Sequence, residues 1–582
     1  MKNQQVAAIL NQIADLLELR QESPYRVAAY REAARQIEGL TEPIEAIDAR
    51  GELESIPRVG ASIAAKIHEF LATGRVAALD QLAREVPSGL LALLQVPGLG
   101  PKRAIQLYRE LGIASIAELR EAAEQHRIHS LRGFGEKSEQ NLLRGIRQLL
   151  QFTGRLPLGE ARAVAERLAA SLRRAAPVER VEIAGSLRRW RETIGDIDLL
   201  ASSRAPEEVV AAFARLPEVA QVLARGETKA TVVTETGLQV DLRVVPPETF
   251  GAALQYFTGS KAHNIKLRTW AEQRGLKVSE YGVFDARTDR RLGGATEEEV
   301  YSLVGLPWIP PELREDEGEL EVARDGTLPR LIELDHLRGD LQTHTRWSDG
   351  HGSVEEMARA AEALGYDYLA ITDHSESLGV AGGLSPAERR AQRAEIDAVN
   401  RRARVRLLVG IEAEIRADGS LDTDDDLLAE CDLVIAALHS GIQQPRDQVT
   451  RRVLAAIRHP RVHVIAHPTN RLLQRRQGAD LDFEAIFAAA AETGTALEIN
   501  AYPDRLDLDD VHARRAVALG VRLAIDTDSH HPSHLALMRY GVAVARRGWV
   551  PPEAVVNTRP LAELRAWLAE KRRWARERRK AA

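Results

Sequence analysis

Two aspartates at alternate positions are the first residues of this sequence whose spacing could support catalysis. Asp196 and Asp198 lie in the segment GDIDLL, residues 195–200, which is typical of a buried β-strand. Because strand side chains alternate between the two faces, both carboxylates would lie on the same face. Adjacent carboxylates repel each other unless a divalent cation lies between them. The spacing therefore predicts a site for a catalytic metal ion.

A third carboxylate lies in a second apolar run. Asp241 belongs to QVDLRVV, residues 239–245, which predicts a buried strand in which an unpaired charge would be costly. We therefore expect Asp241 to complete a three-carboxylate metal site with Asp196 and Asp198. The alternative is that Asp196 and Asp198 cap a turn and that Asp241 pairs with Arg243.

A glycine turn precedes the first of these strands. In GSLRR, residues 185–189, Gly185 and Ser186 can offer backbone N–H groups and a hydroxyl to a triphosphate, and Arg189 can add a cation. Phosphate binding beside paired carboxylates is what nucleotidyl transfer by two metal ions requires.

The segment YFTGSKAHNIKLR, residues 256–268, narrows this prediction. Together with the aspartates and the glycine turn, it resembles the nucleotide pocket of family X DNA polymerases, within the nucleotidyltransferase superfamily. The resemblance implies Mg²⁺ or Mn²⁺ at the three aspartates and triphosphate binding by Gly185, Ser186 and Arg189. It also implies a deoxynucleotide pocket lined by Tyr256, Phe257, Gly259 and Asn264, with Arg268 bracing the templating strand. Asn264 would read base edges in the minor groove. Lys261 departs from the family pattern, because relatives often carry an acidic residue there. The alternative is that these residues only pack a helix.

Three short segments repeat one plan of helix, tight hairpin and helix. They are IPRVG, VPGLG and LRGFG, which begin at residues 56, 96 and 131. Such hairpins direct the free N–H groups of the following helix at a phosphate without reading bases, and they resemble helix-hairpin-helix motifs. The resemblance implies the following DNA-binding residues: Gly60, Gly98, Gly100, Lys102, Gly133, Gly135 and Lys137. Arg58 stands where the first hairpin would usually have glycine. The alternative is that the glycines only cap helices.

Residues 1–85 resemble the small lyase-like domain of the same polymerases. The segment YRVAAYR, residues 25–31, matches the region that holds a 5′-phosphate, with Arg26 in place of a usual cation. In relatives with 5′-deoxyribose-phosphate lyase activity, the Schiff-base lysine falls at Lys66, the only lysine between residues 3 and 101. Lys66 is therefore a candidate nucleophile, and the alternative is that it only grips phosphate.

The C-terminal part of the chain contains 12 of the 16 histidines, between residues 336 and 534. Short apolar runs there repeatedly end in a metal-ligand type, and helical stretches separate them. This predicts a β/α barrel whose polar residues converge at the carboxyl ends of the strands. The set resembles the PHP (polymerase and histidinol phosphatase) domain. By this resemblance Mn²⁺ and/or Zn²⁺ would be held by His344, Asp349, His374, Glu412, His439, His467, Asp528 and His530. Asp373 would support them from behind. Gln342 replaces the first histidine of the family's usual His-x-His, and an amide is a poor transition-metal ligand.

The 582 residues suffice for several domains, and the net charge of −6 means that DNA binding depends on local patches. The single cysteine, Cys431, excludes an intramolecular disulfide and fits a reducing compartment. We expect no membrane segment, a cytoplasmic location and a monomer.

The predicted fold is multidomain α/β: helix-hairpin-helix domains, an α+β palm and thumb, and a distorted PHP barrel. The predicted boundaries are 1–85 lyase-like, 86–150 fingers, 151–248 palm, 249–310 thumb, 311–335 a largely irregular linker, and 336–575 PHP. The basic tail from Lys571 to Arg579 is expected to be solvated.

The order of these domains resembles bacterial and archaeal DNA polymerases of family X. The resemblance implies filling of gapped or nicked DNA with dNTPs in base excision repair. It also implies a 3′–5′ exonuclease or phosphoesterase in the PHP domain, which in relatives also cuts at abasic sites or cleans 3′ ends. Two other interpretations remain: a DNA-end-binding scaffold with decayed sites, and a small-molecule nucleotidyltransferase fused to a phosphatase.

Overall fold

The protein is described here by a computed structural model. It describes the chain except residues 1, 21, 39–43, 74–75, 86–89, 91–92, 94–95, 97–98, 114–115, 130, 132, 136–137, 144–145, 147–154, 235–236, 377–381 and 582. The chain forms two compact units: Met1–Gly154 with Leu378–Gly383, and Arg155–Ser377 with Leu384–Ala582. None of the helices in the described ranges combines the length and apolar character needed to cross a bilayer.

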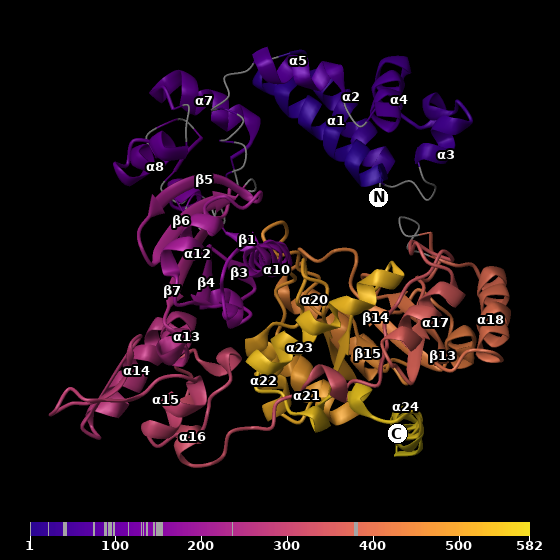
Figure 1. Ribbon diagram of the computed structural model, residues 1–582. Coiled ribbons are helices and arrows are strands. Elements are labelled where there is room, and N and C mark those ends of the chain that lie inside the picture. The colour runs from indigo at the N-terminus through magenta and orange to yellow at the C-terminus, as the bar shows by residue number, and fades with distance from the viewer. Residues whose placement is uncertain are drawn as a thin grey trace. The chain divides into compact units, whose positions relative to one another are not determined.

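The first unit is helical (Figure 1). Its helices are α1 (Lys2–Leu19), α2 (Pro24–Glu38), α3 (Ile44–Ala49), α4 (Ala61–Thr73), α5 (Ala77–Glu85), α7 (Pro101–Leu111) and α8 (Ile116–Glu124). Their apolar faces form one buried cluster that includes Leu10, Ile37, Ile67 and Leu107.

The three predicted hairpins share one turn geometry. In each, a backbone N–H bonds the carbonyl three residues earlier at 3.0 Å: Val59 to Ile56, Leu99 to Val96, and Phe134 to Leu131. Arg58 takes the left-handed conformation, with φ +70°, that Gly133 takes at φ +87° in the third hairpin. The first hairpin thus differs from the third in sequence but has the same backbone conformation at this position. The arginine is strained there, because this conformation favours glycine.

The palm is a five-stranded sheet in the order β2-β4-β7-β6-β5. Its strands are β2 (Arg180–Ile183), β4 (Asp196–Ser202), β5 (Val219–Arg225), β6 (Lys229–Thr234) and β7 (Gln239–Val245), and β1 (Leu156–Pro157) pairs with β3 (Thr193–Ile194). The helices are α10 (Leu158–Ala175), α11 (Gly185–Arg188) and α12 (Pro206–Phe213). β4 and β7 lie parallel and adjacent, so the two carboxylate-bearing strands are neighbours.

The thumb follows with α13 (Phe250–Thr258), α14 (Lys261–Glu272), the sheet of β8 (Leu276–Ser279), β9 (Gly282–Asp285) and β10 (Arg291–Gly293), α15 (Glu297–Leu303) and α16 (Glu319–Arg324). The expectation of a largely irregular linker at 311–335 is wrong in part. Leu313, Leu320 and Ala323 are buried in the thumb core. The last two lie on α16, whose apolar face the Pro-rich and acidic composition of the segment concealed.

Seven parallel strands in strict chain order form the C-terminal barrel. They are β11 (Gly339–Asp340), β12 (Tyr368–Ile371), β13 (Arg406–Glu414), β14 (Leu433–Ala437), β15 (Val464–Ile465), β16 (Ala496–Asn500) and β17 (Leu523–Asp526). A parallel bridge between Thr343 and Ser529 brings the two edge strands together. The barrel predicted from the sequence is confirmed, and its carboxyl ends meet at one rim.

The barrel helices are α17 (Val354–Ala363), α18 (Pro386–Asn400), α19 (Asp425–Glu430), α20 (Arg446–Arg458), α21 (Phe483–Thr493), α22 (Asp510–Ala518), α23 (Met538–Arg547) and α24 (Leu561–Ala581). The expectation of a solvated tail is wrong for Lys571 on α24. Its ammonium is buried and donates to the carbonyl of Ile457 and to Thr495 Oγ1, both at 2.6 Å. Burial lowers the pKa of Lys571 to about 7.

Candidate active sites

The palm brings the three predicted aspartates to one region of its sheet. Asp198 lies directly opposite Asp241 across the parallel pair β4–β7, and Asp196 lies opposite Gln239. Asp196 and Asp198 share a face because they alternate along β4. These positions are those that the sequence pattern predicted.

Asp198 is the most perturbed carboxyl of this group. Burial, together with the negative charges of Asp196 and Asp241, raises the pKa of Asp198 to about 7. A carboxyl in this environment ionises readily only when a cation lies beside it. The donor set of three hard oxygen ligands fits Mg²⁺ or Mn²⁺.

The carboxylate of Asp241 is held within the sheet. It accepts hydrogen bonds from Thr231 Oγ1 and, at 2.8 Å, from Gln239 Nε2. Among the described residues, groups of three or more ligand atoms within 4.8 Å of one another occur elsewhere and not at the three aspartates.

The glycine turn touches this carboxylate group. Gly185 has φ +60°, and a Cβ atom at this position would lie 2.1 Å from Asp198 Oδ2. Ser186 follows at the start of the single helical turn α11. Only glycine satisfies both the conformation and the close approach.

The guanidinium of Arg189 is held beside the turn. Its Nε donates to Glu315 Oε1 at 3.1 Å, and its Nη1 donates to the carbonyl of Thr258. Gly259 lies close by, because a Cβ there would lie 3.1 Å from Nη1 of Arg189. Nε and Nη1 of Arg189 thus contact protein, whereas Nη2 has no hydrogen-bond partner in the described part of the chain.

The thumb places the remaining predicted pocket residues on α13 and α14. Tyr256 and Phe257 pack edge to face with ring centroids 5.2 Å apart. Asn264 donates to the carbonyl of Tyr256 at 2.7 Å and accepts from Gln255 Nε2 at 2.8 Å, so its amide must exchange partners to contact a base. Arg268 is exposed and donates to the carbonyl of Asn264 at 3.3 Å.

The helical unit contains the predicted phosphate-gripping residues. Lys66 Nζ donates to the carbonyl and hydroxyl oxygens of Ser62 at 2.9 and 3.0 Å, and it lies 5.9 Å from the ring centroid of Tyr30. Arg26 is exposed and pairs with Glu22 at 3.4 Å.

The hairpin residues lie at the starts of two helices. Gly60 directly precedes α4, and Gly100 caps α7, which Lys102 continues with an exposed side chain. Gly133 and Gly135 belong to the third hairpin. Gly98 and Lys137 lie outside the described residues.

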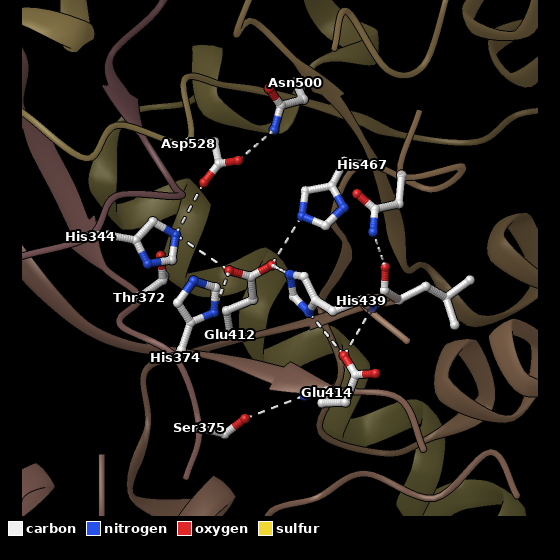
Figure 2. A network of polar contacts seen from close by, with 12 residues as sticks. His344, Thr372, His374, Ser375, Glu412, Glu414, His439, His467, Asn500 and Asp528 are labelled. Carbon is white, nitrogen blue, oxygen red and sulfur yellow. Dashed lines mark hydrogen bonds and ion pairs between the residues drawn. The ribbon is translucent and has the colours of Figure 1, made fainter. Parts of the chain in front are cut away.

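The barrel rim collects all eight histidines and carboxylates that the sequence predicted as metal ligands. Glu412 lies at their centre (Figure 2). Its Oε2 lies 3.3 Å from His344 Nε2 and 3.2 Å from His374 Nδ1. Its Oε1 lies 3.4 Å from His439 Nε2 and 3.1 Å from His467 Nε2.

Two aspartates also contact the histidines of this group. Asp528 Oδ1 lies 3.2 Å from His344 Nε2. Asp349 lies 3.5 Å from His374 Nε2 and 3.3 Å from His530 Nε2. Three overlapping ligand groups result, each with ligand atoms within 4.8 Å of one another: His344–Asp349–His374–His530, His374–Glu412–His439 and His344–Glu412–Asp528.

The charges of this group are strongly coupled. Burial disfavours ionisation of Glu412, but the surrounding histidines outweigh it and hold its pKa well below the usual range. Burial likewise opposes protonation of His439, yet Glu412 and Glu414 raise its pKa to about 9. Glu412 and His439 therefore stabilise each other's charged forms.

Several buried atoms fit a metal site. His344 Nδ1 and Nε2, His374 Nδ1 and Glu412 Oε2 have no hydrogen-bond partner of good geometry among the described residues. Buried polar atoms normally have partners, and imidazole nitrogens with carboxylates suit Mn²⁺ and Zn²⁺. The residues therefore fit the implied metals. The Oε1 and Nε2 atoms of Gln342 are also buried, and neither has a hydrogen-bond partner among the residues that the structure describes.

The sequence interpretation missed the residues that orient these ligands. Glu414 accepts from His439 Nδ1 at 2.9 Å, and Asn500 donates to Asp528 at 3.2 Å. Glu412 and Glu414 stand two residues apart on β13, and this alternation was a signal that both face the rim. The carboxylate of Asp373 accepts hydrogen bonds from Thr345, Ser348 and Gln392. This is consistent with the expectation that it supports the ligands from behind.

Comparison with known proteins decides the family. Four family models match: a helix-hairpin-helix domain at residues 1–76, a SAM-like helix-hairpin-helix tandem at 90–148, a DNA polymerase beta thumb at 253–315 and a PHP domain at 340–502. The DNA polymerase/3'-5' exonuclease PolX of Bacillus subtilis (strain 168) is 40% identical over 571 residues, which cover 98% of this chain and 99% of that protein. This chain belongs to the family X DNA polymerases.

Two other relatives resemble parts of this family X chain. DNA polymerase lambda of Rattus norvegicus is 26% identical over 321 residues, 50% of this chain and 52% of that protein. A probable phosphatase of Thermoanaerobacter sp. (strain X514) is 28% identical over 250 residues, 40% of this chain and 94% of that protein. The predicted combination of helix-hairpin-helix domains, polymerase thumb and PHP barrel is confirmed.

Proposed function

We propose that this chain is a DNA-directed DNA polymerase that fills short gaps by nucleotidyl transfer and that its PHP domain is a 3′–5′ exonuclease. The observation that carries the proposal is the presence of two intact ligand sets in one chain. Asp198 lies opposite Asp241 in the palm, and Glu412 lies at the centre of the histidine group on the barrel rim. The PolX relative named a polymerase and exonuclease spans nearly the whole chain.

In the polymerase reaction the 3′-hydroxyl oxygen of the primer forms a bond to the α-phosphorus of a dNTP. The bond from that phosphorus to the bridging oxygen breaks, and pyrophosphate leaves. Bound Mg²⁺ or Mn²⁺ would supply positive charge for the attacking and leaving oxygens. Asp196 and Asp198 would hold the ion of the nucleotide, and all three aspartates the ion nearest the hydroxyl. Gly185, Ser186 and Arg189 would bind the β- and γ-phosphates.

In the exonuclease reaction the oxygen of a water molecule forms a bond to the phosphorus of the terminal phosphodiester. The bond from that phosphorus to the 3′-oxygen of the preceding nucleotide breaks, so that a nucleoside 5′-monophosphate leaves and the shortened strand keeps a 3′-hydroxyl. Bound Mn²⁺ or Zn²⁺ would supply an activated water and polarise the phosphate oxygens. Glu412, the four histidines around it, Asp349 and Asp528 would hold these ions. Glu414 would keep the ring of His439 in its orientation through Nδ1.

Gapped or nicked DNA is the proposed substrate. Three hairpins with a common turn geometry supply phosphate-gripping elements, and Lys66 and Arg26 would hold a 5′-phosphate at the far side of the gap. Filling and cleaning of gaps together suit base excision repair. Cleavage at abasic sites, the lyase activity of Lys66, the monomeric state and the cytoplasmic location stay predictions.

One gel tests the two activities together. A 5′-labelled primer on one-nucleotide-gapped DNA is incubated with Mn²⁺, with and without dNTPs. We expect extension with dNTPs and shortening without them. Asp198→Asn should abolish extension alone, and His374→Ala should abolish shortening alone. Extension without shortening would limit the PHP domain to a structural role. If the protein binds the DNA but yields neither product, the interpretation as a DNA-end-binding scaffold is favoured. If it shows no salt-sensitive binding to DNA, the interpretation as a small-molecule nucleotidyltransferase is favoured.

A further inference from the structure

The ion pairs that join the polymerase part (residues 155–333) to the barrel part (residues 339–571) all have their charges arranged in the same way. Among the described residues, every ion pair between 155–333 and 339–571 has its arginine in the barrel part and its glutamate in the polymerase part. The pairs are Arg471–Glu192, Arg514–Glu317, Arg539–Glu166, Arg546–Glu312, Arg546–Glu333 and Arg547–Glu315. One of them reaches the proposed triphosphate site.

Arg547, the last residue of α23, is the arginine that reaches it. Its side chain is only 3% exposed. Its Nη1 donates to the backbone carbonyl of Arg189 at 2.8 Å and to Glu315 Oε1 at 3.1 Å, and its Nη2 lies 2.6 Å from Asp510 Oδ2. Arg547 thus contacts the main chain of a residue in the glycine turn motif.

Glu315 connects Arg547 to the side chain of Arg189. The same oxygen, Oε1, accepts from Nε of Arg189 and from Nη1 of Arg547, both at 3.1 Å. Arg191 adds a more distant cation at 3.8 Å. The backbone carbonyl of Arg189 contacts Arg547 directly, and its guanidinium is connected to the same barrel side chain through Glu315.

The barrel core sets the place of Arg547. α23 packs so closely on the strands that a Cβ atom at Gly541 would lie 2.5 Å from Ile525 Cγ2 and 2.8 Å from Ala501 Cβ. Ile525 belongs to β17, which leads directly to Asp528 and His530. A helix packed in this way cannot shift without moving the barrel strands.

We propose that Arg547 is a positioning residue for the polymerase nucleotide site, contributed by the PHP barrel. It fixes the backbone of Arg189 and shares the charge of Glu315, so that Arg189 presents Nη2 to the triphosphate. This inference rests on the proposed polymerase function, and it gives the barrel a part in nucleotide binding that is independent of hydrolysis.

The charges predict the direction of the effect. Glu315 is now shared between Arg189 and Arg547. Without Arg547 more of the charge of Glu315 would act on Arg189 and would compete with the triphosphate for that guanidinium. Buried charged groups that lose one partner change their interactions strongly. We therefore expect weaker dNTP binding with little change in the chemical step.

The test compares two neighbouring arginines in the full-length protein. Arg547→Met should raise the KM for dNTP about tenfold, the effect of losing one charged hydrogen bond, with kcat and exonuclease rate nearly unchanged. Arg546→Met is the matched control: Arg546 also joins α23 to the polymerase part, through Glu312, but does not touch Glu315. It should leave the KM unchanged. A general loss of structure would instead lower both activities.

A double-substitution cycle tests the route through Arg189. Arg547→Met added to Arg189→Met should raise the KM no further, because the side chain it positions is gone. Additive effects, an unchanged KM in Arg547→Met, or equal effects of the two α23 arginines would overturn the proposal. If Arg547→Met melts below the assay temperature, Arg547→Lys decides: it keeps the charge but cannot reach all three acceptors, so an unchanged KM would also overturn the proposal. Absence of extension by the unmodified protein would instead contradict the proposed function.

Discussion

Gly185 and Asp198 are so close that no side chain fits between them. A Cβ atom at Gly185 would lie 2.1 Å from Oδ2 of Asp198 and 3.0 Å from its Cγ. The turn that would bind triphosphate is therefore packed directly against the carboxylate that would hold the metal ion. A change in either one displaces the other.

Gly185→Ala should consequently abolish gap filling while leaving the exonuclease intact. A displacement of about 1 Å in a catalytic group costs roughly 10²-fold in rate. The measurement is primer extension on gapped DNA beside exonuclease shortening of the same primer. Gly237→Ala is the matched control, because Gly237 lies in the same palm with φ +78° but has nothing within 4 Å of a Cβ. Equal losses in both variants would show that backbone strain, not contact with Asp198, is responsible.

The raised pKa of Asp198 predicts a pH-dependent metal requirement. Burial and the neighbouring aspartates raise its pKa to about 7, so below that pH the metal-free carboxyl is mostly protonated and a proton must leave as a cation binds. The Mg²⁺ concentration for half-maximal extension should rise as the pH falls below 7, by up to about tenfold per unit, and should be flat above it. Titrations of Mg²⁺ at several pH values check this. A requirement that stays constant below neutrality would refute it.

Gln342→His should strengthen metal binding at the barrel rim. The amide of Gln342 is buried and has no hydrogen-bond partner among the described residues, and imidazole is the better ligand for Mn²⁺ or Zn²⁺. We expect the exonuclease to reach half-maximal rate at a metal concentration about tenfold lower, with extension unchanged. Metal content measured after gel filtration gives a readout independent of activity. A higher metal requirement would mean that the amide itself is a needed ligand.

Glu412 and Glu414 should differ sharply in importance. Glu412→Gln removes the carboxylate shared by four histidines, so exonuclease activity should fall more than about 100-fold and bound metal should be lost. Glu414→Gln affects only the orientation of His439 and should cost about tenfold. Polymerase activity serves as the internal control in both variants. A larger loss in Glu414→Gln would contradict the central place of Glu412.

Lys66 separates phosphate gripping from lyase chemistry. Its ammonium is held by two oxygen atoms of Ser62, an arrangement that presents a cation. Lys66→Arg should keep the preference for a gap with a 5′-phosphate, whereas Lys66→Ala should weaken that preference about tenfold. Borohydride trapping on a 5′-deoxyribose-phosphate end measures the other role. A trapped adduct that Lys66→Arg eliminates would establish the lyase.

The sequence predicted those features that local spacing determines. Asp196 and Asp198 share a face because strands alternate, and the histidines meet because parallel strands end at one rim. The same alternation places Glu412 and Glu414 on one face of β13, and it could have predicted that Glu414 contacts the metal ligands. The helix α16 was hard to predict because it is only six residues long and lies in an acidic, Pro-rich segment. The contact of Arg547 with Arg189 has no local signature, since it joins residues whose proximity depends on how two domains pack.

Strict strand order in the barrel has a consequence during synthesis of the chain. β11 to β17 follow one another in sequence, and the rim ligands follow them, from His344 first to His530 last. Because the palm precedes the barrel in the chain, the ribosome releases every palm residue before the rim has its full set of ligands. α23, with Arg547, emerges later still, directly after the final ligand. The nascent protein acquires nucleotide-site residues first, then a complete nuclease centre, and only at the end the arginine that joins them.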